Sequence, residues 1–186
     1  MKYLRKVFWR LKAKLGSYRA GGQIVFGKTK IKVPLACAGN KGTIIIGDKS
    51  SFGDKYAPMS GDGRILLQAR ERAAVITIGL NASFSNNVSM IARESISIGN
   101  DFLCGDGVRI MDSDFHEVAP EQRLIGKGKT SSIVIGNNVW LGSGVMILKG
   151  VIIGDHSIVA SGSVVTKNVP GRVIVGGIPS QVIRQI

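Results

Sequence analysis

The sequence predicts an all-β protein, a parallel β-helix built from six-residue repeats, with one helix at its N-terminus. The first observation is a period of six within residues 133–170, where an aliphatic residue recurs at every sixth position: Ile135, Leu141, Ile147, Ile153, Val159 and Val165. The second is the composition, because 25 glycines and few aromatic residues suit short strands joined by tight corners. A period of six fits neither a helix nor a flat strand. Each repeat should therefore form one side of a triangular coil, with its aliphatic residue pointing inward.

The same step occurs earlier in the chain. It links Ile78, Phe84 and Met90, and after a slip of two residues it links Ile98, Cys104 and Ile110. Residues 17–75 carry imperfect repeats, and the turn-forming residues between 57 and 63 predict early coils with protruding loops. The two cysteines make no disulfide framework, and we expect Cys104 to pack inside as a small apolar residue.

The repeat breaks between residues 111 and 132, where the chain becomes polar and charged. A loop of this length inside a compact repeat is usually functional. The predicted organisation is a helix over residues 1–18, a coil over 19–170 with an extruded loop at 111–132, and a C-terminal tail over 171–186, in which residues 182–186 could form a short strand or helix.

Residues 1–16 predict an amphipathic helix that Gly16 would end. Its apolar positions are Leu4, Val7, Phe8, Leu11 and Leu15, and its basic positions are Lys2, Arg5, Lys6, Arg10, Lys12 and Lys14. One interpretation is a cap over the open end of the coil. The other is a helix lying on an anionic membrane surface, which suits basic residues beside Phe8 and Trp9. The two are compatible.

The net charge of +13 is concentrated at the N-terminus, since eleven Lys and Arg precede the first acid, Asp48. The remainder has a surplus of only two positive charges, which argues against a nucleic-acid-binding surface on the coil. No apolar run approaches the ~20 residues of a membrane span, and the N-terminus does not read as a secretory signal. We expect a cytoplasmic protein, with peripheral association at the inner face of the cytoplasmic membrane as an open alternative.

Two histidines are available for chemistry. His156 falls at an outward corner position, where we expect a solvent-facing side chain. His116 stands at the mouth of the extruded loop, near Asp112 and Asp114. A carboxylate could hold one ring nitrogen and leave the other as a base. Spacing alone leaves base and bystander equally open.

From Ile78 to the C-terminus the sequence resembles the sugar and polysaccharide acetyltransferases of the hexapeptide-repeat family. The segments 135–142, IGNNVWLG, and 176–179, GGIP, carry the resemblance. It implies a left-handed coil, transfer of an acetyl group from acetyl-CoA to a hydroxyl or amine, and His116 as general base. The family's galactoside and maltose enzymes have Gly-His-Pro at this histidine, whereas this chain has Phe115-His116-Glu117. The departure points to the branch that decorates capsule, lipopolysaccharide or exopolysaccharide.

The resemblance also implies the partners of His116. A backbone N–H of Gly142 or Ser143 would stabilise the oxyanion. Coenzyme A would contact Ser143, Ser161, Thr166, Lys167 and Arg184, although the family's second C-terminal basic residue is replaced here by Gln181. The acceptor would contact Asn86, Asn87, Asp112 and Asp114, while ordinary corner roles remain equally open for the two asparagines. The family assembles as homotrimers with the active sites between subunits, so Trp140 would lie near a neighbour's loop.

Three functions remain open at this point. The leading interpretation is an acetyl-CoA-dependent O-acetyltransferase acting on a sugar or polysaccharide precursor. The second is N-acylation of an amino sugar on a nucleotide or lipid carrier, and the third is a non-catalytic hexapeptide scaffold. We predict no metal site, because two histidines from unlike places cannot supply the three imidazoles of a γ-carbonic anhydrase. Serine acetyltransferase is disfavoured, since its long helical N-terminal domain is missing.

Overall fold

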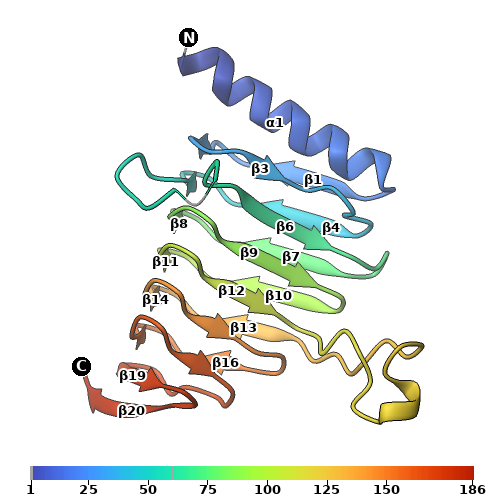
Figure 1. Cartoon of the computed structure of the whole chain (residues 1–186). Coiled ribbons are helices and arrows are strands. Elements are labelled where there is room, and N and C mark those ends of the chain that lie inside the picture. Colours follow the sequence, from blue (N-terminus) through green and yellow to red (C-terminus); the bar gives the residue numbers. More distant parts are fainter. Residues whose placement is uncertain (1, 60) are drawn as a thin grey trace.

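The chain folds as the predicted left-handed parallel β-helix (Figure 1). The computed structural model describes residues 2–59 and 61–186, with side chains from Val7 onward. Three sheets of parallel strands form the three sides of the coil, and up to β18 every third strand along the chain joins the same sheet. In the regular coils, lateral partners such as Val134 and Ile152 are 18 residues apart, which is three six-residue sides.

The strands are short, as repeats of six residues require. Sheet A contains β1 (Gln23–Phe26), β4 (Thr43–Ile46), β7 (Val75–Ile78), β10 (Ser95–Ile98), β13 (Ile133–Ile135) and β16 (Ile152–Ile153). Sheet B contains β2 (Lys30–Ile31), β5 (Ser51–Phe52), β8 (Ser83–Phe84), β11 (Leu103–Cys104), β14 (Trp140–Leu141), β17 (Ile158–Val159), β19 (Val173–Gly177) and β20 (Ser180–Gln185). Sheet C contains β3 (Leu35–Ala36), β6 (Ile65–Ala69), β9 (Ser89–Ala92), β12 (Arg109–Met111), β15 (Met146–Ile147) and β18 (Val164–Val165).

The predicted inward positions form the core. All six aliphatic residues of the regular repeats are at most 1% exposed, and Ile78, Phe84, Met90, Ile98, Cys104 and Ile110 are at most 5% exposed. Three phenylalanines stack from coil to coil, with ring centroids of Phe52 and Phe84 4.9 Å apart and those of Phe84 and Phe102 5.4 Å apart. Each buried side chain of this size contributes about 1.5–3 kcal/mol. Burial also raises the pKa of the Cys37 thiol to about 12, so this cysteine stays protonated at neutral pH.

At the corners between sheets A and B, a side-chain oxygen of one coil accepts a backbone N–H of the preceding coil. The carboxamide oxygen of Asn137 accepts the N–H of Asn100 at 2.9 Å, and the carboxylate of Asp155 accepts the N–H of Asn137 at 2.6 Å. Asn138 and His156 take left-handed backbone angles, with φ of 51° and 62°. His156 is exposed at this corner, as the repeat register predicts.

Two loops leave the coil, one at each of the other two edges, on opposite sides of the view in Figure 1. Residues 53–64 connect β5 to β6 at the edge between sheets B and C, called here the B–C edge. Residues 112–132 connect β12 to β13 at the edge between sheets C and A, the C–A edge, and include a short 3-10 helix at Pro120–Gln122. The two-residue slip lies between β9 and β10, where Arg93 and Glu94 lengthen the same C–A edge.

Helix α1 (Lys2–Arg19) closes the first coil and extends past Gly16, which does not end it. Gly16 lies over the Ala38 backbone, where a Cβ would stand at an ordinary van der Waals distance of 3.6 Å from the Ala38 nitrogen. Ala13 and Ser17 are buried against the coil, and the Asn40 amide donates to the Ser17 hydroxyl at 2.6 Å. The cap is therefore made by Ala13 and Ser17 together with the half-buried Trp9, which packs against the core. The apolar positions from Val7 onward point elsewhere, and the predicted positions Lys2, Leu4, Arg5 and Lys6 lie outside the side chains described.

The prediction of a separate tail over residues 171–186 is wrong in its boundary. Strand β19 continues sheet B in parallel beside β17, and β20 folds back on β19 as an antiparallel hairpin. The hairpin extends sheet B at the C-terminal end of the coil; Val173 and Val175 of β19 are buried, whereas the residues of β20 after Ser180 are exposed.

Candidate functional site

His116 stands where the chain leaves β12 for the long loop. Its Nδ1 lies 3.0 Å from the backbone carbonyl oxygen of Arg123, within the same loop. A carbonyl oxygen only accepts, so Nδ1 must carry the proton and donate it to Arg123. This tautomer leaves a lone pair on Nε2, and the ring is exposed. The geometry thus fixes the imidazole in the form that a general base requires.

The loop folds back on His116, where Gly128 closely approaches the backbone of the histidine. A Cβ on Gly128 would stand 2.5 Å from the His116 carbonyl oxygen, and Gly128 has a φ of 70°. The neck of the loop is held by an antiparallel bridge between Ser113 and Thr130, and the Asp114 N–H donates to the Lys129 carbonyl at 3.1 Å. Glycine at 128 is what allows the loop to close against the histidine.

Neither carboxylate near His116 orients the ring. Asp112 is fully buried, and its two oxygens accept the backbone N–H groups of Arg93 and Glu94, each at 2.8 Å. Burial raises the pKa of Asp112, while the two amide donors lower it. Asp114 forms an ion pair with Lys149 at 2.6 Å. The carboxylate partner suggested by spacing is therefore replaced by the Arg123 carbonyl, and Asp112 holds the slipped corner between β9 and β10.

A shallow pocket of about 320 Å³ opens beside His116. It is lined by Arg70, Glu71, Arg93, Phe115, His116, Gly126 and Lys127. The Arg70 guanidinium lies over the Phe115 ring at 5.0 Å, and Arg93 pairs with Glu71 at 3.5 Å. Sequence reasoning missed these cations. The register could have found them, because Arg70 and Arg93 follow β6 and β9 at the edge where His116 follows β12.

The predicted oxyanion donors lie on the other edge. Gly142 and Ser143 follow β14 at the B–C edge, directly against Ser161 of the next coil. The Gly142 N–H is already committed to the Val159 carbonyl at 2.8 Å, so it is not available for an oxyanion. The Ser143 N–H has no acceptor within residues 2–59 and 61–186. Of the two predicted donors, only Ser143 keeps a free amide.

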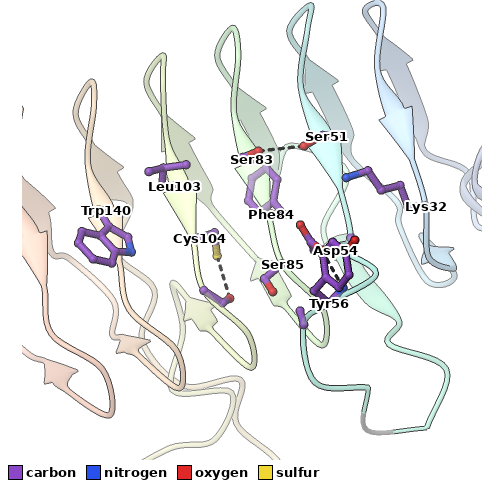
Figure 2. A pocket seen from close by; sticks show the side chains of 13 residues that line it. Lys32, Ser51, Asp54, Tyr56, Ser83, Phe84, Ser85, Leu103, Cys104 and Trp140 are labelled. Carbon is purple, nitrogen blue, oxygen red and sulfur yellow. Dashed lines mark hydrogen bonds between the residues drawn. The ribbon is translucent and has the colours of Figure 1, made fainter.

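A larger pocket of about 550 Å³ lies on sheet B beside this edge, and Figure 2 shows its lining. Trp140 and Leu103 stand outward at one end of the row, and Asp54, Tyr56 and Lys32 stand at the other. Serines lie between them, with the hydroxyls of Ser51 and Ser83 2.9 Å apart. This combination of one indole face and several hydroxyl and charged groups suits a polar, hydroxyl-rich ligand.

Asn86 and Asn87 hold the loop that borders this pocket. Asn86 is fully buried; its carboxamide accepts the Asp54 N–H at 3.0 Å and donates to the Asp54 carbonyl at 2.9 Å, with longer contacts to Ala57 and Pro58. Asn87 is half-buried and donates to Asp106 at 2.7 Å and to the Pro58 carbonyl at 3.1 Å. The Asn86 side chain is thus fully engaged within the chain.

The predicted coenzyme contacts divide between the same two edges. Ser143 and Ser161 are exposed at the B–C edge, while Thr166 and Lys167 are exposed after β18 at the C–A edge, the edge of His116. Arg184 is exposed on the terminal hairpin. Within the described part of the chain, no three His, Cys, Asp or Glu side chains converge as metal ligands.

One chain cannot bring the two edges together. A side of six residues at about 3.3 Å each places His116 and Ser143 on the order of 20 Å apart. Proton transfer and oxyanion stabilisation require contacts of about 3 Å. If His116 and Ser143 serve one site, the C–A edge of one molecule must lie against the B–C edge of another.

Comparison with known proteins agrees with this architecture. Residues 132–167 match the family model described as bacterial transferase hexapeptide (six repeats). The chain is 40% identical to the galactoside O-acetyltransferase of Escherichia coli strain K12 over 111 residues, 60% of this chain and 54% of that protein. The chain thus spans about half the length of that relative.

A second relative matches over a longer region. The Escherichia coli K12 protein named "Putative lipopolysaccharide biosynthesis O-acetyl transferase WbbJ" is 31% identical over 146 residues, 73% of this chain and 71% of that protein. Among solved structures, a galactoside acetyltransferase in complex with coenzyme A superposes with a TM-score of 0.60 at 32% identity, over 75% of this chain and 66% of that chain.

Proposed function

The chain belongs to the bacterial hexapeptide-repeat transferase family, and we propose from this premise that it is an acetyl-CoA-dependent O-acetyltransferase acting on a sugar or polysaccharide precursor. The observation that carries the proposal is the hydrogen bond from His116 Nδ1 to the Arg123 carbonyl at 3.0 Å, which leaves Nε2 free as a base. Relatives named for galactoside and lipopolysaccharide acetylation support a saccharide acceptor.

The reaction follows from the groups present. His116 Nε2 removes the proton of an acceptor hydroxyl while that oxygen attacks the thioester carbonyl of acetyl-CoA. The free N–H of Ser143 donates to the resulting oxyanion. When the intermediate collapses, the carbon–sulfur bond breaks, and the imidazolium returns its proton to the leaving thiolate. The products are the acetyl ester and coenzyme A.

The proposed contacts to coenzyme A and to the acceptor come from residues of both edges. Ser143 and Ser161 would line the pantetheine arm at one edge, and Thr166 with Lys167 would meet it from the other. Lys167 and Arg184 are exposed cations suited to the phosphates. The acceptor would occupy the pocket of Trp140, with Asn87 and Asp114 as further contacts. Asn86 and Asp112 would act by positioning the two loops rather than by touching the acceptor.

The assembly is proposed as a homotrimer, since a ring of three brings each C–A edge against a neighbour's B–C edge. The tip of the long loop supports this arrangement, because Val118, Leu124 and Ile125 are 74%, 93% and 76% exposed. Three large apolar side chains on one loop tip indicate a surface that another molecule covers. The neighbour's Trp140 and Leu103, each about half exposed, offer a matching apolar surface.

The test is acetyl transfer measured by intact mass, with acetyl-CoA and a panel of sugars, amino sugars and lipid-linked oligosaccharides. His116→Ala should lower turnover by about 10²–10⁴ with the melting temperature nearly unchanged, because the exposed ring contributes to chemistry and not to packing. His156→Ala removes the other histidine, at a corner, and should leave turnover near wild type. Wild-type turnover in His116→Ala would refute the assignment of the base. Acetyl transfer to amino groups alone would contradict O-acetylation and assign N-acylation as the function.

A further inference from the structure

Helix α1 has two faces with different surroundings. The face toward the coil carries Ala13 and Ser17, both buried, together with the half-buried Trp9 and Arg10. Arg10 is tied down as well, since its guanidinium donates to the Gly27 carbonyl and lies over the Phe26 ring at 5.1 Å. This face accounts fully for the capping of the first coil.

The opposite face is an exposed apolar stripe. Its members are Val7 (42% exposed), Phe8 (55%), Leu11 (62%), Leu15 (49%) and Tyr18 (79%). At 100° per residue their centre lies about 150° from the centre of the capping face, and the stripe runs for about 17 Å. In Figure 1 the helix lies across the end of the coil. The exposed fractions place most of the stripe in solvent, while Leu15 also lines the cavity between α1 and β3. Capping does not explain five large side chains left in solvent.

Cations border the stripe on both sides. Lys14 lies along one side, and Lys12 and Arg19 lie along the other, all exposed. Lys12 Nζ remains within 5.9 Å of the Phe8 ring centroid and 5.5 Å of that of Trp9. Lys12 and Arg19 also line a cavity of about 420 Å³ between α1 and β3. The acid lining it, Asp62, is paired with Arg64 at 3.0 Å.

We propose that this stripe docks α1 on an anionic membrane surface, with its apolar side chains among the acyl chains and its cations at the headgroup phosphates. The amphipathic pattern of aromatic and aliphatic residues between rows of Lys and Arg is that of an interfacial helix. No helix in the described residues is long and apolar enough to cross a bilayer, so the contact lies on the surface. A second copy is a poor occupant, because the first 47 residues contain eleven Lys and Arg and no acid.

Assembly of three chains in a ring would strengthen the contact of α1 with the membrane. Three parallel coils place their first turns at the same end, so three stripes would face one plane. Simultaneous engagement multiplies weak single contacts. This added strength rests on the proposed trimer, whereas the contact of one helix does not.

The test is sedimentation of the full chain with vesicles of phosphatidylcholine containing phosphatidylglycerol, against vesicles of phosphatidylcholine alone. Phe8→Ser with Leu11→Ser should weaken binding more than tenfold and leave the melting temperature near wild type, because both side chains are exposed. Lys12→Gln with Lys14→Gln should weaken binding to anionic vesicles about 25-fold, at about fivefold per cation. Removing the whole helix would be a poorer test, since it would expose the first coil.

The matched control is Val182→Ser with Ile186→Ser, which removes two side chains of similar exposure, 54% and 57%, at the far end of the coil. It should bind vesicles like the wild type. The proposal is overturned if the wild type ignores anionic vesicles at low salt, or if the stripe variant binds as well as the wild type. It is also overturned if the stripe variant only lowers the mass of the free protein, because the occupant is then a second copy. None of these outcomes depends on acetyl transfer.

Discussion

The two loops of the coil make opposite contributions to the proposed site. The loop at the C–A edge is fixed by its own backbone, through the Ser113–Thr130 bridge and the approach of Gly128, and it presents His116. The loop at the B–C edge is fixed by two side chains, the buried Asn86 and the half-buried Asn87, and it borders the pocket beside Ser143. In the proposed site, one edge therefore carries the proton acceptor and the other the amide donor. A chain that separates these functions by a whole side of the coil gains a complete site only through assembly.

The largest expected effect comes from mixing two variants, each of which lacks the function of one edge. His116→Ala disables one edge and Trp140→Ala disables the other, so each variant trimer should be nearly inactive alone. Refolding an equal mixture should restore about a quarter of the wild-type turnover, because about one interface in four pairs an intact His116 with an intact Trp140. Acetyl transfer by the mixture is the measurement.

The matched control mixes wild type with the double variant His116→Ala, Trp140→Ala. A site shared between chains retains about a quarter of the turnover, whereas a site within one chain retains about half. A mass of one chain, 19.8 kDa, in sedimentation would contradict the assembly directly.

An intermediate effect is expected at the anchor of the B–C loop. Asn86→Ala removes a buried carboxamide that serves Asp54 through both its oxygen and its nitrogen. Leaving those partners unsatisfied should cost about 1–3 kcal/mol and lower the melting temperature by several degrees. The comparison variant is Asn87→Gly, which keeps the left-handed backbone angle, φ 60°, and should cost less. An unchanged melting temperature in Asn86→Ala would mean that Asn86 does not anchor the loop.

The smallest effect concerns Asp112 at the C–A edge. Burial raises its pKa in the folded state above the ordinary value, so the folded chain holds this proton more firmly than the unfolded chain. Its contribution to stability is therefore greatest at low pH and falls as the pH rises from the ordinary to the raised pKa. Melting temperatures across this range should show wild type losing stability relative to Asp112→Asn. Asp114→Asn, at the exposed pair with Lys149, serves as control, and a rise in place of the fall would contradict the direction.

Much of the fold could be predicted from local pattern. The period of six placed Ile135, Cys104 and Ile110 inside, because a residue's position in a repeat fixes which side of the strand it occupies. The break at 111–132 located the loop, and the scarcity of histidines singled out His116. The pattern could not give the partner of His116, since the Arg123 carbonyl reaches it only through the path of the folded loop.

The sequence by itself determined the repeat, the inward residues, the extruded loop and the basic N-terminus, because each depends on residue type and spacing along the chain. Only the tertiary structure decided which groups are free. Gly142 and Ser143 are adjacent in sequence, yet stacking against the next coil engages the amide of one and leaves that of the other. The same holds for α1, where spacing identifies an apolar stripe but not its direction. The face that carries Ala13 and Ser17 is buried against the coil, and this leaves most of the stripe in solvent.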